Sequence, residues 1–146
     1  MIDVDAMIDR DVETNKAVLA YGERFTDVPV TWGLDDCSMF AAQWAADRLG
    51  REFVFPSYEG EDEGRALIAS YGGLVPVWDA VAEANGLSRV HGPVRAGDIG
   101  VIHTFAHGDV GCIFMKYGTM VMIRATTGVR LIGIREKHVA GAWRVE

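Results

Sequence analysis

The sequence predicts an α+β fold in which helices come first along the chain and an antiparallel sheet follows. Apolar residues repeat with a helical period through the first half and with the alternating period of strands through the second half. Only short turns separate the expected strands, and such strands run antiparallel because parallel neighbours need a long crossover. The 146 residues fit one domain, which we divide into a helical lead-in (1–28), a segment of three helices (29–95) and the sheet (96–146).

The second expected helix has the clearest limits. Asp36 is its expected N-cap, because a carboxylate there accepts an unpaired N–H of the first turn, and Gly50 follows its end. Five residues fall on one face of this helix, namely Cys37, Phe40, Ala41, Trp44 and Ala45. The other helices are expected at 11–21, 61–71 and 76–85.

Five segments of the second half are expected to form strands. They are 99–105, 110–115, 120–125, 129–134 and 142–145. His103 alternates in phase with Ile99 and Val101, so these three side chains are expected on one face of the first strand. The result is a sheet of about five strands that packs against the helices.

The composition excludes several classes of function. A net charge of −7 disfavours nucleic-acid binding, which depends on Lys and Arg replacing counterions. No apolar run approaches the ~18 residues that span a bilayer, and the acidic N-terminus lacks the features of a signal peptide. We therefore expect synthesis in the bacterial cytoplasm and no membrane insertion. The two cysteines, Cys37 and Cys112, are expected to be free thiols.

Cys37 is the main candidate for chemistry. A thiol at a helix N-terminus lies beside unpaired N–H groups and the positive end of the helix dipole, which favour the nucleophilic thiolate. The same N–H groups suit an oxyanion. The neighbouring charges of Asp35 and Asp36 oppose this effect by raising the thiol pKa. Cys37 as a small buried residue of the helix face is the alternative interpretation.

The residues around Cys37 resemble the NlpC-type cell-wall peptidases, a branch of the papain-like superfamily. The resemblance is carried by short motifs in the family's order: Trp32-Gly33, Asp36-Cys37-Ser38, Pro56-Ser57, Gly97-Asp98-Ile99 and Asp109-Val110-Gly111-Cys112-Ile113. It implies a papain-like fold, Cys37 as nucleophile, peptidoglycan as substrate, and a substrate site that includes Trp32, Asp36 and Ser38.

A second resemblance spans nearly the whole chain. It is to small proteins of unknown function from phage and prophage tail gene clusters, including gene transfer agents. The shared motifs are Val30-Thr31-Trp32-Gly33-Leu34-Asp35-Asp36-Cys37, Gly72-Gly73, Gly97-Asp98 and Ala142-Trp143-Arg144. This resemblance implies assembly into a phage-like tail, with other tail or tail-tip proteins as partners.

The catalytic base is the main departure from the peptidase pattern. Asp109 stands where the peptidases carry histidine, and a cysteine peptidase needs a histidine within reach of the thiol. The candidate bases are His107, in the turn between the first two expected strands, and His103, on the first of these strands. Each has a structural alternative, as a turn residue or a strand residue. The cysteines lack paired spacing, so we expect no metal site and no cofactor.

Two functions therefore remain open at the level of sequence. The retained Asp36-Cys37-Ser38 favours a tail-associated cysteine peptidase or amidase that cleaves peptidoglycan stem peptides during cell-wall penetration. Asp109 in place of histidine favours a catalytically inactive papain-like domain that serves as a structural or adaptor component of the tail tip.

Overall fold

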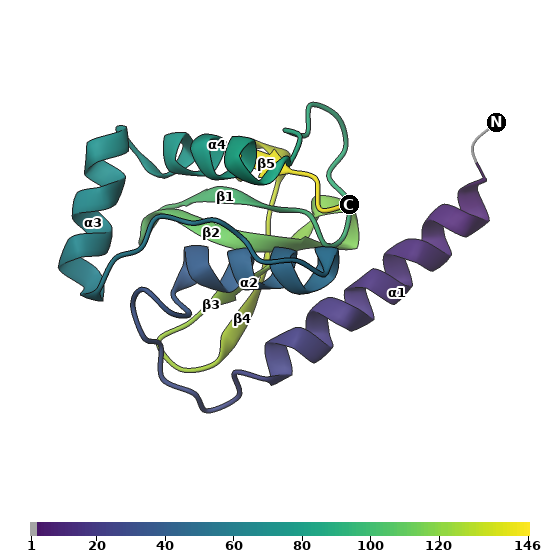
Figure 1. Ribbon diagram of the computed structural model, residues 1–146. Helices are drawn as coiled ribbons and strands as arrows, with labels where there is room; N and C mark the ends of the chain where they lie inside the picture. Colours follow the sequence, from purple (N-terminus) through teal and green to yellow (C-terminus); the bar gives the residue numbers. More distant parts are fainter. Residues whose placement is uncertain (1–2) are drawn as a thin grey trace.

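The computed structural model describes residues 3–146; Met1 and Ile2, at the start of the predicted lead-in, lie outside the described residues. Four α-helices precede five strands: α1 (Val4–Glu23), α2 (Cys37–Leu49), α3 (Gly60–Tyr71), α4 (Leu74–Asn85), β1 (Ile99–Thr104), β2 (Gly108–Met115), β3 (Met120–Arg124), β4 (Val129–Gly133) and β5 (Val139–Trp143). Two single-turn 3₁₀ helices, Lys116–Gly118 and Glu136–His138, lie among the strands. The predicted α+β class is confirmed (Figure 1).

The strands form one antiparallel sheet in the order β4-β3-β2-β1-β5. The chain runs back and forth from β1 to β4, as the short turns predicted, and β5 then returns to pair with the open side of β1. Helix α2 packs along β2 and β1, with α4 beside it and the second half of α1 across β2 (Figure 1). The sheet thus forms a platform that supports the N-terminus of α2.

Helix α2 has the limits that the sequence predicted. The Asp36 side chain accepts hydrogen bonds from the N–H groups of Ser38 and Met39, which caps the first turn. Gly50 ends the helix with a φ of 66°, in the left-handed region that glycine enters without strain. Cys37 is therefore the first residue of the helix.

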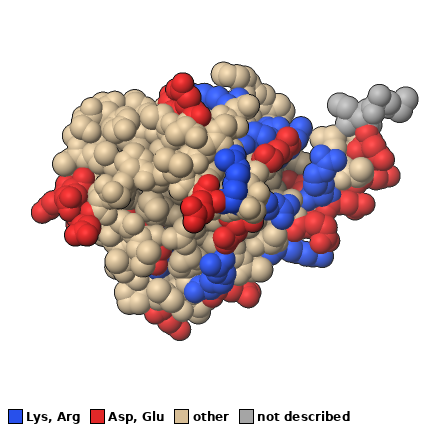
Figure 2. Space-filling view, in the orientation of Figure 1, with Lys and Arg blue, Asp and Glu red and all other residues tan. Residues whose placement is uncertain are grey.

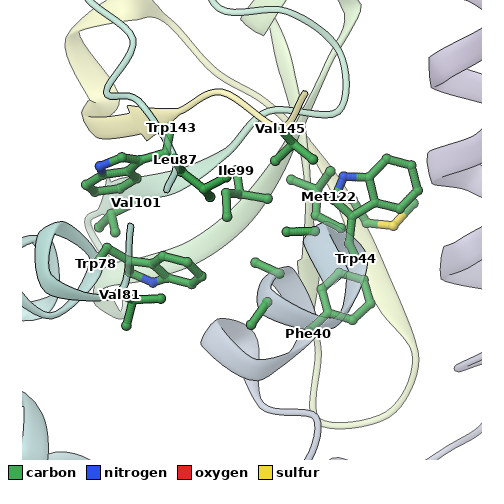
Figure 3. Packing of buried hydrophobic residues seen from close by; sticks show 14 of the residues in the cluster. Phe40, Trp44, Trp78, Val81, Leu87, Ile99, Val101, Met122, Trp143 and Val145 are labelled. Atoms are coloured by element: carbon green, nitrogen blue, oxygen red, sulfur yellow. The ribbon is translucent and has the colours of Figure 1, made fainter. Parts of the chain in front are cut away.

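The main core lies between α2, α4 and the sheet (Figure 3). Its largest buried side chains include Phe40 of α2, Trp78 of α4 and Trp143 of β5. The rings of Trp78 and Trp143 lie 6.0 Å apart between centroids. A smaller cluster, around Cys112 and Phe114, lies on the opposite face of the sheet. Burial of each large side chain contributes about 2–3 kcal/mol, so the sheet is anchored from both faces.

Several predicted limits were wrong; for example, β2 begins at Gly108 instead of residue 110, and α4 begins at Leu74 instead of residue 76. Helix α1 begins at Val4 instead of residue 11, although residues 3–10 are exposed and this part extends away from the body in Figure 1. Strand β5 covers Val139–Trp143 instead of 142–145, because it must reach back to pair with β1. Phe105 lies in the β1–β2 turn and is fully exposed, because β1 ends at Thr104.

No helix within residues 3–146 is both long enough and apolar enough to cross a membrane.

Candidate active site

Cys37 lies on a cleft of about 850 Å³ that α3 borders on one side and the β3–β4 hairpin on the other. The side chain of Cys37 is half-buried. The same cleft is lined by His107, from the turn before β2, and by Asp109, from the start of β2. The predicted nucleophile and two of the candidate basic or acidic groups therefore share one cavity.

Asp36 holds the loop before α2 in place. Its carboxylate accepts hydrogen bonds from the N–H groups of Gly33 (2.7 Å), Ser38 (3.2 Å) and Met39 (3.3 Å). The Tyr58 hydroxyl donates to the same carboxylate, at 2.7 and 2.6 Å from its two oxygens. Charge-assisted bonds of this kind are stronger than neutral ones. Asp36, predicted as a substrate-binding residue, is thus engaged by four groups of its own chain.

The pKa of the Cys37 thiol is raised by its surroundings. Burial is the largest effect and raises its pKa above the ordinary value of 9.0. The backbone N–H of Gly111 lowers this pKa, whereas the negative charge of Asp36 raises it. Because this pKa is raised, attack by the sulfur requires a base that removes its proton.

Strand β2 approaches the start of α2 so closely that only glycine fits at position 111. A Cβ built there would lie 2.9 Å from the backbone oxygen of Cys37 and 3.2 Å from the Cα of Ser38. This close approach brings the Gly111 N–H to the sulfur. Asp109, two residues earlier on β2, projects from the same face of the strand as Gly111.

The two candidate histidines lie at different places on the β1–β2 hairpin. His103 pairs across the strands with Asp109, and its Nδ1 lies 2.8 Å from Asp109 Oδ1. His107 is exposed in the turn, where its backbone N–H donates to Thr104 Oγ1 at 3.0 Å. The hairpin therefore brings a carboxylate–imidazole pair and a second imidazole to one end of the sheet.

Arg124, at the end of β3, forms a buried ion pair with Asp35. Its Nη2 lies 3.1 Å from Asp35 Oδ2, and the Arg124 side chain has no exposed surface. Arg124 Nη1 also donates to the Gly128 carbonyl at 2.7 Å, and Asp35 Oδ1 accepts from the Thr31 N–H at 2.7 Å. This network ties the loop before Cys37 to the β3–β4 hairpin.

The other predicted substrate residues border the cleft in different environments. Trp32 is half-buried, and the Arg65 Cζ atom lies over its ring, 5.8 Å from the ring centroid. Ser38 is buried, and its Oγ accepts a hydrogen bond from Trp78 Nε1 at 3.4 Å. Trp32 is thus placed to form a wall for a ligand, whereas Ser38 is joined to the core.

A family profile described as a domain of unknown function, DUF6950, matches residues 9–145. The chain belongs to the DUF6950 family. A search of curated proteins found no match.

In this DUF6950 protein, Tyr58 is a site residue that the sequence analysis missed. It lies 22 residues from Asp36 and follows the Pro56-Ser57 stretch, where no pattern relates it to the Cys37 loop. The Arg124–Asp35 pair was also missed, since the two residues are far apart in sequence. Cys37 and Cys112 are free, as predicted. No group of three or more His, Cys, Asp or Glu side chains suited to a metal ion occurs among the residues described.

Replacing Asp36 with asparagine is expected to increase the reactivity of Cys37 near neutral pH. The amide oxygen can still cap α2, whereas the negative charge that raises the thiol pKa is removed. Alkylation by iodoacetamide, followed by mass spectrometry from pH 6 to 10.5, measures the midpoint for Cys37. We expect a midpoint above 9 for the unmodified protein and a lower one for Asp36→Asn.

Glu61→Gln is the matched control, because it removes a charge from the same cleft without touching the Asp36 network. A midpoint below 9 in the protein without substitutions would contradict a raised pKa of the thiol.

Proposed function

We propose that this DUF6950 protein has a papain-like fold and is a cysteine peptidase or amidase. Its proposed substrate is the peptidoglycan stem peptide, cleaved while a phage-like tail penetrates the cell wall. The observation that carries the proposal is the position of Cys37, which opens α2 on a cleft that His107 and Asp109 also line. A nucleophile, a candidate base and a cavity for a peptide are the minimum that amide hydrolysis by a thiol requires.

In the proposed reaction His107 accepts the Cys37 proton as the sulfur attacks the amide carbonyl. The backbone N–H of Cys37 belongs to the first turn of α2 and can donate to the oxyanion that forms. His107 then gives the proton to the leaving amine, and a thioester remains on Cys37. Water then attacks the thioester while His107 takes a proton from it, and His107 returns this proton to the Cys37 sulfur as the carboxylic acid product leaves. Because the pKa of the thiol is raised, the proposed attack depends on His107 to take the proton.

The tail setting is supported by sequence motifs. The run from Val30 to Cys37 and the later Gly72-Gly73, Gly97-Asp98 and Ala142-Trp143-Arg144 are the features shared with phage and prophage tail proteins. In the proposal the protein is made in the bacterial cytoplasm and is then assembled with tail or tail-tip proteins.

A non-catalytic role in the tail tip is the second candidate. Two observations favour it: Asp109 occupies the position of the usual base and pairs with His103, and the Cys37 pKa is raised. In this alternative the scaffold is retained for assembly or for binding the cell wall, and the thiol has no chemical task.

Purified protein and its Cys37→Ala variant, incubated with isolated cell walls, separate the two candidates. We expect the unmodified protein to release peptide fragments with new amino termini, and the variant to lose at least about a thousandfold in rate. Equal release by both proteins, or no release by either from walls of several bacteria, would remove Cys37 from the chemistry and leave the tail-tip role.

A further inference from the structure

A second groove, of about 830 Å³, shares no lining residue with the Cys37 cleft. The first half of α1 and the end of α2 form one side of it. The segment 88–98 and the residues after β5 form the other side. Nothing in the proposed reaction uses this groove, so its properties bear on a separate function.

Arginine is concentrated in this groove. Five of the eleven arginines of the chain line it, namely Arg10, Arg48, Arg89, Arg95 and Arg144. Figure 2 shows that the basic side chains of this face lie in the half next to α1, where acidic side chains are interspersed among them. In a chain with a net charge of −7, the pairing of each arginine therefore decides whether the groove can hold an anion.

Two of these arginines have no carboxylate partner. Among the side chains of residues 3–146, none places a carboxylate within 4.0 Å of the Arg10 or Arg48 guanidinium. Arg48 Nη2 lies 3.3 Å from Thr14 Oγ1, and its guanidinium lies 5.7 Å from the Trp44 ring. Thr14 follows Arg10 by four residues on α1, so the two side chains are neighbours on one helix face. The two guanidinium groups therefore border the same stretch of the groove.

The carboxylates of the groove are already engaged. Asp11 accepts from Asn15 Nδ2 at 2.9 Å and from the Ala96 N–H at 3.4 Å. Asp98 is buried and lies 3.2 Å from Arg144 Nε. The third, Glu146, is paired with Arg95 at 2.5 Å. Asp98 and Glu146 are thus paired with other arginines, Asp11 is held by neutral donors alone, and Arg10 and Arg48 form no ion pair among the described residues.

We propose that this groove binds a phosphate monoester, with Arg10 and Arg48 as the principal ligands. Two guanidinium groups that form no ion pair suit the charge of about −2 that a phosphate monoester carries near pH 7. The planar guanidinium also presents paired N–H donors that fit phosphate oxygens, and its engagement is stronger than that of a neutral donor. Apolar residues of the groove, including Leu49 and Val94, suit the organic part of such a ligand.

Isothermal titration calorimetry of the intact protein with glycerol 3-phosphate tests the proposal. The Arg10→Gln/Arg48→Gln variant is expected to bind at least tenfold more weakly. Arg24→Gln/Lys137→Gln is the matched control, since it removes the same charge from the surface outside the groove, and it is expected to bind within twofold of the unmodified protein. Vesicles of phosphatidylcholine with and without phosphatidic acid show whether a lipid headgroup is also a source of the phosphate.

Arginine modification by phenylglyoxal gives a readout that needs no variant. In peptide maps of the protein without substitutions, glycerol 3-phosphate is expected to protect Arg10 and Arg48, but not Arg24, from reaction with phenylglyoxal. Absence of protection at millimolar ligand, equal affinity for the dicarboxylate succinate, or equal weakening in the control variant would each overturn the proposal. Because none of these measurements involves Cys37, their outcome is independent of peptidase activity.

Discussion

Replacing His107 with alanine is expected to lower the rate of wall hydrolysis by about 10²–10⁴-fold, the usual contribution of a general base. His107 lines the cleft that holds Cys37, and the neutral thiol cannot attack until a base removes its proton. The assay is the release of new amino termini from isolated cell walls, at matched protein concentration and with unfolding curves for each variant.

His103→Ala is the matched control for this prediction. His103 lies on the same hairpin and is also exposed, but its imidazole is held by Asp109 and does not line the cleft. We expect it to lose less than tenfold in rate, and both variants to change the free energy of unfolding by no more than about 0.5 kcal/mol. Full activity in His107→Ala together with a large loss in His103→Ala would contradict the assignment and would make His103 the base.

Removal of Asp35 is expected to destabilise the protein by about 3–5 kcal/mol, because Arg124 would remain charged in a site with no exposed surface. For a chain of this size such a loss corresponds to a fall of roughly 10–16 °C in the unfolding temperature. Thermal and urea unfolding of Asp35→Ala, monitored by tryptophan fluorescence, measure it.

The double replacement Asp35→Leu/Arg124→Met tests the physical reason. It removes both charges and is expected to recover about half of the lost free energy, whereas the hydrogen bonds to Thr31 and Gly128 stay lost. The exposed pair Arg24–Asp47, at 2.8 Å, is the control, and Asp47→Ala is expected to cost less than about 1 kcal/mol. Similar losses for Asp35→Ala and Asp47→Ala would contradict the importance of burial.

Local signals predicted the fold well. Asp36 and Gly50 set the limits of α2, because a side-chain cap and a left-handed residue act within one helical turn. The alternating pattern and short turns likewise gave four consecutive antiparallel strands. The start of α1 was missed although Val4, Met7 and Ile8 fall at helical spacing, an apolar stripe that stays exposed in the structure.

The candidate site was only partly predictable. The sequence indicated Cys37 as the first residue of a helix and named both histidines of the hairpin. It did not pair His103 with Asp109, although a turn centred near residue 106 would have placed them opposite each other. Long-range contacts such as Tyr58 with Asp36 leave no local pattern, because the two partners are joined only after the chain has folded.

The close contact of Gly111 with Cys37 has a consequence for biosynthesis. The half of the chain that leaves the ribosome first contains α2 with its thiol, whereas the strand that covers this thiol is made later. Until that strand docks, the sulfur stays open to oxidants and to other nascent chains. Docking of that strand therefore turns an open thiol into a half-buried one whose remaining exposed side faces the cleft.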